Sequence, residues 1–233
     1  MPNQIRKPGL GIVFMHHTTD EVTLYHLDKI KKLHPTAVIT PIGQTDKLPG
    51  GYSLLGTPDL DRRHAWKRER SGDVLLLSWW VQHQEQAQRW WIVEADTLCE
   101  IPITEFFWPV WEFPFLCVSR REAWRDDTWY WFSKIEKDKI PAKYHKYLAG
   151  SVPFFYVIRD DFLAAIANCL LSGDWRWGNS ELRFMTAARM CGFEPCAFSP
   201  PWDRVTWIPW QQRQLTGPKS IWHPVKRIME RAT

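Results

Sequence analysis

The stretch RWWIVEADTLCEIPITE, residues 89–105, decides the fold. Its apolar run WWIV, at 90–93, is typical of a strand that is buried on both faces of a parallel sheet. The run stops at two acidic residues, Glu94 and Asp96. Because ligands of open α/β sheets lie at the carboxyl ends of the strands, we expect both carboxylates to face a pocket. The plainer alternative is that they only end a strand and begin a turn.

Two carboxylates this close together favour a cation between or beside them. Carboxylate oxygens suit Mg²⁺ or Mn²⁺, and such an ion keeps coordination positions open for the phosphates of a nucleotide. The sequence therefore predicts a divalent metal site, with a nucleotide, at the end of this strand.

Apolar runs and helical patterns alternate along the rest of the chain. Strands are predicted over residues 9–15, 37–40, 73–78, 115–118 and 154–158, helices over 20–33, 59–70, 103–108, 162–172 and 181–191, and a long loop over 43–58. The order of strand, helix and strand at the N-terminus implies parallel pairing. We therefore expect an α/β protein with a mostly parallel central sheet flanked by helices.

Composition limits the class of protein. A length of 233 residues suits one domain, and 30 basic against 26 acidic residues give a net charge of only +4, far below that of a dedicated nucleic-acid-binding protein. Five cysteines without a Cys-X-X-Cys pair predict reduced thiols and a cytoplasmic protein. No apolar window is long enough to span a membrane or to serve as a secretory signal.

The chain is unusually rich in tryptophan, with 16 residues. Most are expected in the core, since indole rings bury a large apolar area. Trp175, Trp177 and Trp222 stand beside glycine, asparagine or charged residues. We expect these three to line a wet cleft, where indole rings can stack on sugars or bases.

The segment WGNSELRFMTAARMCG, residues 177–192, predicts a helix whose first turn carries Glu181. Asn179 and Ser180 are suited to cap that helix, which would hold the carboxylate at the edge of a cleft, where it could act as a general base. The alternative is an ordinary first-turn acid that the helix dipole stabilises. Asp174 is a second candidate base, and Arg183 could contact an acidic group of a substrate.

Histidines also follow predicted strands. His16 and His17 come after the first strand, where a nucleotide base could lie, although paired histidines in a loop are commonly just solvated. Near the C-terminus, His223 precedes a proline, which favours an extended or turn conformation that suits a metal ligand. Lys226 could neutralise phosphate charge.

Three of these motifs resemble those of glycosyltransferases with the GT-A fold. Glu94-Ala95-Asp96 resembles the Asp-X-Asp motif that binds metal and nucleotide-sugar, residues 177–192 resemble the acceptor-side segment with a catalytic carboxylate, and residues 221–226, IWHPVK, resemble the C-terminal histidine segment. They occur in the family's order and span roughly the last two thirds of the chain.

The resemblance implies a single GT-A-like domain over residues 1–233, with a nucleotide-binding part over about 1–110 and an acceptor part over about 111–233. A sugar would pass from a UDP- or GDP-linked donor to an acceptor hydroxyl, with Mn²⁺ or Mg²⁺. The implied roles are metal binding for Asp96 and His223, donor binding for Glu94, Asp96, His16 and Lys226, proton removal for Glu181 or Asp174, and substrate contact for Trp175, Trp177, Asn179 and Arg183. Because Glu94 stands where the family has Asp, it could contact either ribose or metal.

The acceptor stays open. A cell-envelope glycan is the ordinary expectation, and a hydroxymethylated base in phage-type DNA is an alternative. The basic run Arg62, Arg63, Lys67, Arg68 and Arg70 could meet a polyanion or an anionic membrane surface as a peripheral contact, or be only a solvated face. A further alternative, from a different functional class, is a non-catalytic, tryptophan-rich carbohydrate-binding protein.

Overall fold

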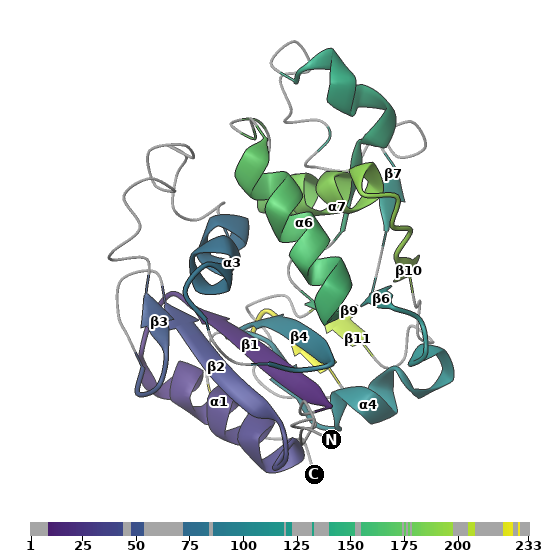
Figure 1. Ribbon diagram of the computed structural model, residues 1–233. Coiled ribbons are helices and arrows are strands. Elements are labelled where there is room, and N and C mark those ends of the chain that lie inside the picture. The colour runs from purple at the N-terminus through teal and green to yellow at the C-terminus, as the bar shows by residue number, and fades with distance from the viewer. Residues whose placement is uncertain are drawn as a thin grey trace, which may run out of the picture.

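A central sheet lies between two layers of helices in the computed structural model (Figure 1). The structure describes residues 9–43, 48–53, 72–83, 86–118, 120–122, 132, 140–151, 155–173, 175, 177, 179–197, 205–207, 221–225 and 228. Among them, no helix is long and apolar enough to cross a membrane. All five cysteines are free thiols.

The central sheet has seven strands in the order β10-β6-β9-β4-β1-β2-β3. They are β1 (Leu10–His16), β2 (Val38–Gly43), β3 (Tyr52–Ser53), β4 (Arg89–Glu94), β6 (Phe115–Cys117), β9 (Phe155–Arg159) and β10 (Cys196–Ala197). Only β9 runs against its neighbours, β4 and β6; the other four pairings are parallel. The prediction of an α/β fold with a mostly parallel sheet flanked by helices is therefore confirmed.

The helices cover both faces of this sheet. They are α1 (Glu21–Leu33), α3 (Gly72–Trp80), α4 (Ile103–Phe106), α6 (Asp160–Ser172) and α7 (Ser180–Met190), with 3-10 helices η2 (Trp108–Val110) and η4 (Ala142–Tyr147). Figure 1 shows α1 and α4 on one side and α3, α6 and α7 on the other. Side chains alternate along the strands, so Trp90 and Ile92 of β4 join the core beneath α3, α6 and α7, while Trp91 and Val93 join the core beneath α1.

The segment 73–78, predicted as a strand, is instead the interior of helix α3. Its run of apolar residues has no clear period, and such a run does not distinguish a buried strand from a helix buried on all sides. The predicted loop over 43–58 includes the short strand β3. The helix predicted over 59–70 lies outside the described residues.

The order in which successive strands are added to the sheet reverses between the neighbouring strands β1 and β4. From β1 the chain passes through α1 to β2 on one side, and β4 lies on the other side of β1. The two strands are parallel and in register, with Met15 of β1 opposite Glu94 of β4. Ligands of doubly wound sheets bind where the carboxyl ends of two such strands meet. Glu94 and Asp96 are therefore at this switch point.

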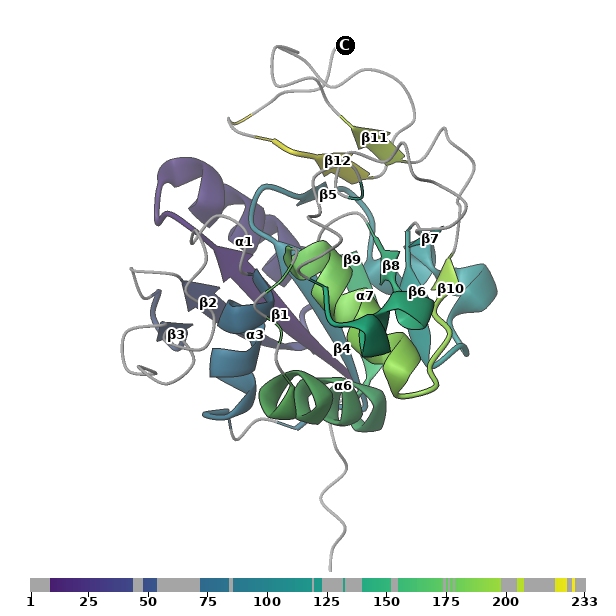
Figure 2. The same cartoon turned by 90° about the horizontal axis from the view of Figure 1, so that it is seen from above.

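A small second sheet carries the C-terminal segment to the same place. It consists of β5 (Leu98–Cys99), β11 (Val205–Trp207) and β12 (Ile221–His223), and Figure 2 shows it at the side of the molecule away from α6. A two-stranded pair, β7 (Arg121–Glu122) with β8 (Ala149–Gly150), completes the fold. Because β12 runs antiparallel to β5, which directly follows Asp96, His223 is returned toward the end of β4.

Trp222 of β12 is fully buried, and its Nε1 donates to Glu100 Oε2 at 3.2 Å. The expectation that this ring lines a wet cleft is wrong, because its neighbours in sequence did not reveal the apolar partners Leu98 and Val225 that enclose it.

Candidate functional site

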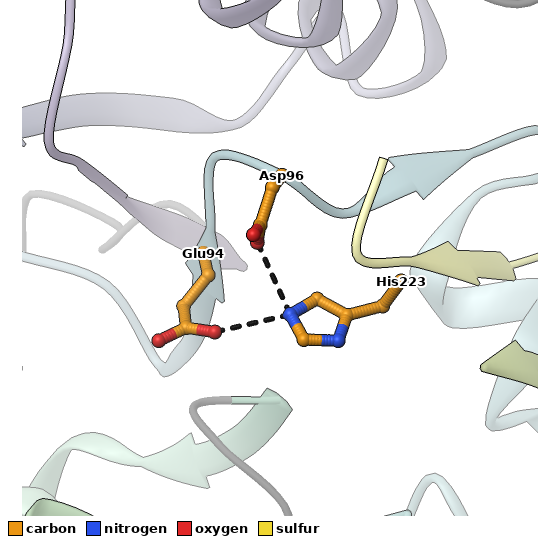
Figure 3. A group of neighbouring side chains, drawn as sticks. All are labelled: Glu94, Asp96 and His223. Carbon is orange, nitrogen blue, oxygen red and sulfur yellow. Dashed lines mark hydrogen bonds and ion pairs between the residues drawn. The ribbon is translucent and has the colours of Figure 1, made fainter. Parts of the chain in front are cut away.

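Three side chains meet at the carboxyl end of β4 (Figure 3). His223 Nε2 lies 3.1 Å from Glu94 Oε2 and 3.1 Å from Asp96 Oδ1. One ligand atom from each of the three residues lies within 4.8 Å of the others, a spacing that could hold a metal ion. The side chains are 14, 21 and 22 % exposed for His223, Glu94 and Asp96, so solvent reaches the group. We call Glu94, Asp96 and His223 the carboxylate–histidine triad.

The triad carries more negative than positive groups. Burial of the ring lowers the pKa of His223, but hydrogen bonds and charges from Asp96 and Glu94 outweigh burial and raise this pKa to about 9. At neutral pH the ring is then an imidazolium that donates from Nε2 between two carboxylates. Within the triad itself, two carboxylates then face one imidazolium, an arrangement that favours a cation.

Backbone hydrogen bonds fix the turn that carries the two carboxylates. Ala95 N donates to Met15 O at 2.7 Å, which ties the turn to β1. Val225 N donates to Asp96 O at 2.7 Å, which ties it to the segment after His223. From helix α1, His26 Nδ1 donates to Ala95 O at 2.6 Å. The three triad residues are thus held by elements from three distant parts of the chain.

An open hollow of about 530 Å³, counted with the solvent at its mouth, lies beside the triad. It is lined by His17, Thr18, Asp20, Val22, Thr23, Glu94, Ala95, Asp96 and Val225. The first turn of α1 forms one wall, where Asp20 Oδ1 caps the helix by accepting from Thr23 N at 2.8 Å. The Asp20 carboxylate already occupies the amino end of α1, so the hollow carries three acidic side chains, those of Asp20, Glu94 and Asp96. This lining favours a cation, and an anionic ligand would need that cation to bind there.

Glu181 lies on the same face of the sheet as Glu94, in the first turn of α7. Asn179 caps this helix, since its Oδ1 accepts from Leu182 N at 3.3 Å, as the sequence predicted. Glu181 is only 7 % exposed and, like Arg183, is not among the residues that line the hollow. Burial first, and then the charges of Glu94 and Asp73, raise the pKa of Glu181 to about 7. A carboxyl with such a pKa can take up a proton near neutral pH.

Arg183 does not contact the hollow. Its side chain is fully buried and makes two hydrogen bonds with Asp73 of α3, from Nε at 2.7 Å and from one terminal nitrogen at 2.6 Å. The expectation that Arg183 contacts an acidic group of a substrate is therefore wrong, because an acidic partner inside the protein already holds it. The sequence concealed this pair, as Asp73 was assigned to a strand.

Trp175 and Trp177 do not line a wet cleft; they are 1 and 4 % exposed. Trp175 Nε1 donates to Cys169 O at 3.1 Å, which satisfies the indole inside the core. The ring of Tyr144 packs against both indoles, with centroids 4.6 and 5.3 Å away. The prediction of substrate contact by these two rings is wrong for the same reason as that for Trp222. Asn179 is 3 % exposed and is used as the helix cap.

His16 belongs to β1 and is buried, with Nδ1 donating to Thr18 O at 3.0 Å. The neighbouring His17 is exposed and lines the hollow, so of the two histidines expected near a base, His17 is the one that reaches it. The prediction for His16 was wrong because the strand runs one residue further than expected. Asp174, Lys226 and the basic residues 62–70 lie outside the described part of the chain.

Sequence reasoning missed three residues around the site: Thr18, Thr23 and His26. The spacing Val22, His26, Ile30 would have revealed His26, since residues four apart lie on one face of a helix. The positions of the two threonines follow from the loop after β1, which local sequence does not determine.

The sequence matches no protein-family model and no curated protein. The argument for function therefore rests on the residues and their geometry.

Proposed function

We propose that this protein is a GT-A-like glycosyltransferase, which moves a sugar from a UDP- or GDP-linked donor to an acceptor hydroxyl with Mn²⁺ or Mg²⁺ bound by the triad. One observation carries the proposal: His223 meets Glu94 and Asp96 at the switch point of the sheet, although His223 and Glu94 are 129 residues apart. Such a convergence is expected of a ligand site at the carboxyl ends of β1 and β4.

The donor set of the triad fits the proposed ion. Carboxylate oxygens are hard ligands that suit both Mg²⁺ and Mn²⁺, and an imidazole nitrogen favours Mn²⁺ of the two. Three protein ligands at an exposed edge also leave coordination positions for phosphate oxygens. When bound, the ion would act as a Lewis acid on the diphosphate leaving group.

Side chains of the protein would contact the donor and remove the proton from the acceptor. Thr18 and Thr23 would offer hydroxyl groups to a metal-bound diphosphate in the hollow, and His17 would be the polar contact for the nucleoside. Glu181 would accept the proton of the acceptor hydroxyl as that oxygen attacks the anomeric carbon. A raised pKa suits this role, because a base is most effective when its pKa is near the working pH.

The proposed acceptor is a glycan, ordinarily one of the cell envelope. A net charge of +4 gives little general attraction for nucleic acid, which favours a glycan over DNA. The enzyme would need no further cofactor than the ion and the nucleotide-sugar.

Calorimetry with UDP and GDP, each with and without Mn²⁺, tests this proposal. We expect the wild type to bind one nucleotide only when Mn²⁺ is present, and Asp96→Asn to lose at least about a hundredfold in affinity, since removal of a carboxylate ligand weakens the metal. Asp28→Asn is the matched control, because Asp28 is an exposed acid on α1 that pairs with Lys32 away from the triad. Its affinity should equal that of the wild type.

Nucleotide binding that is indifferent to both EDTA and Asp96→Asn would overturn the proposal. Binding of free sugars without metal or nucleotide would instead identify a non-catalytic carbohydrate-binding protein.

A further inference from the structure

We infer that His26 is a positioning residue that sets the separation of the two triad carboxylates by holding the peptide between them. The inference rests on the proposed metal site. It concerns a histidine that lies outside the triad, in the second turn of helix α1.

His26 contacts the centre of the carboxylate turn, which consists of Glu94, Ala95 and Asp96. Its Nδ1 lies 2.6 Å from the carbonyl oxygen of Ala95, the residue between Glu94 and Asp96. A carbonyl oxygen only accepts, so the proton is on Nδ1. This short bond is buried, and it joins residues 69 positions apart in sequence. Rotation of the Ala95 peptide would turn Glu94 and Asp96 relative to each other, and the hydrogen bond opposes that rotation.

A histidine is a costly choice at this position if packing is its only purpose. The side chain is 1 % exposed, and its second nitrogen, Nε2, has no hydrogen-bond partner among the described residues. Burying a polar nitrogen without a partner costs free energy, which a leucine in the same place would not incur. The single hydrogen bond to Ala95 is therefore the feature that distinguishes histidine from an apolar residue here.

The expected consequence is a change of metal affinity and not of fold. Groups that orient metal ligands through hydrogen bonds typically change metal affinity by about 10- to 100-fold when removed. His26 would act in this way on both carboxylates at once, through the backbone that they share.

The C-terminal cap of helix α1, His34, provides a matched control. It is buried too, at 6 % exposure, and its Nδ1 donates to Ile30 O at 3.0 Å. Its Nε2 accepts from Ile103 N at 2.9 Å, so it ties α1 to α4 and not to the carboxylate turn. Loss of His34 should loosen the same helix without moving the triad.

The test is Mn²⁺ binding to the full chain, followed by the loss of the free-ion signal in electron paramagnetic resonance, with thermal unfolding measured alongside. His26→Leu should weaken Mn²⁺ binding by about tenfold or more. His26→Asn should retain most of the affinity, because its amide nitrogen stands as many bonds from the backbone as Nδ1. His26→Gln places the amide one bond further away, so it should weaken binding even if the leucine variant fails to fold. His34→Leu should bind as the wild type does.

Equal affinities of wild type, His26→Leu and His26→Gln would overturn the inference alone and leave the metal site standing. An equally large loss in His34→Leu would also overturn it, since the effect would then be a general loosening of α1. No Mn²⁺ binding by the wild type would overturn both the inference and the metal-dependent function.

Discussion

Two groups of charged side chains both act on the pKa of Glu181, and they are built in opposite ways. Asp73 and Arg183 are both fully buried, and two short hydrogen bonds join them. In the triad, two carboxylates share one imidazole, and all three side chains remain partly exposed. The charges of Asp73 and Arg183 balance each other. The triad instead holds two carboxylates against one imidazole, beside a hollow.

This difference separates structural from functional charge. A buried pair has no capacity for a further partner, and its removal leaves an unpaired charge in the core. A partly exposed group with a surplus charge has that capacity, and surface ion pairs contribute little to stability. The same sequence therefore uses charge at one place to fasten α3 to α7 and at another to attract a ligand.

The largest expected effect is on the buried pair. Arg183→Leu should lower the free energy of unfolding by about 3 to 5 kcal/mol, because Asp73 is left buried and uncompensated. Denaturant unfolding followed by circular dichroism measures the change. The double variant Asp73→Leu with Arg183→Leu should be more stable than the single variant. A single variant that loses less than the double one would contradict a structural role for the pair.

Glu181→Gln should keep Mn²⁺-dependent nucleotide binding and reduce sugar transfer by about a hundredfold or more, since an amide cannot accept the acceptor's proton. In the wild type, transfer should rise with pH through about 7 and then level off, because only the deprotonated carboxylate acts as a base. Transfer rates across pH 5 to 9, with a donor that calorimetry has identified, provide the measurement. Undiminished transfer by Glu181→Gln would assign the base to another group.

The raised pKa of Glu181 also predicts a pH dependence of stability. Between the ordinary carboxyl pKa and about 7, the folded state binds more protons at Glu181 than the unfolded state, so this residue lowers stability as the pH rises through that window. Glu94 on β4, Asp73 on α3 and Tyr156 on β9 face the charge that then develops. Glu181→Gln should be more stable than the wild type by about 3 kcal/mol at pH 8, and the gain should shrink at pH 5. A gain that does not depend on pH would show that burial of the charge is not its cause.

The smallest expected effect is that of Asp96→Asn on stability. Its side chain is 22 % exposed, and Glu94 still accepts from His223 in the variant, so the loss should be only about 1 kcal/mol. Thermal unfolding of the metal-free variant beside the wild type measures it. A loss as large as that of Arg183→Leu would mean that the triad is also structural, and the contrast between the two groups would disappear.

The sequence predicted the parts of the fold that depend on local pattern. The strand at Arg89–Glu94 and the helix at Ser180–Met190 were found from apolar runs and a cap. Residues 73–78 were misassigned, because a helix buried on all sides has no polar face to give it a period. The sequence did not predict which side chains are enclosed by elements from distant parts of the chain.

In the candidate site, too, local pattern was predicted and tertiary contacts were not. The two carboxylates at the end of β4 were predicted from a rule about sheets, and His223 from the order of three motifs. Trp175, Trp177 and Arg183 were placed in a cleft from their neighbours in sequence, yet each is enclosed by residues from other elements, such as Tyr144 and Asp73. Burial is a property of tertiary contacts, which adjacent residues do not encode.

Anomalous diffraction from crystals grown with Mn²⁺ tests the central claim most directly. The account predicts one manganese peak between Glu94, Asp96 and His223, with the three ligand atoms about 2.0 to 2.3 Å from the ion. It would be contradicted by the absence of a peak at saturating Mn²⁺, with His223 still bound to both carboxylates.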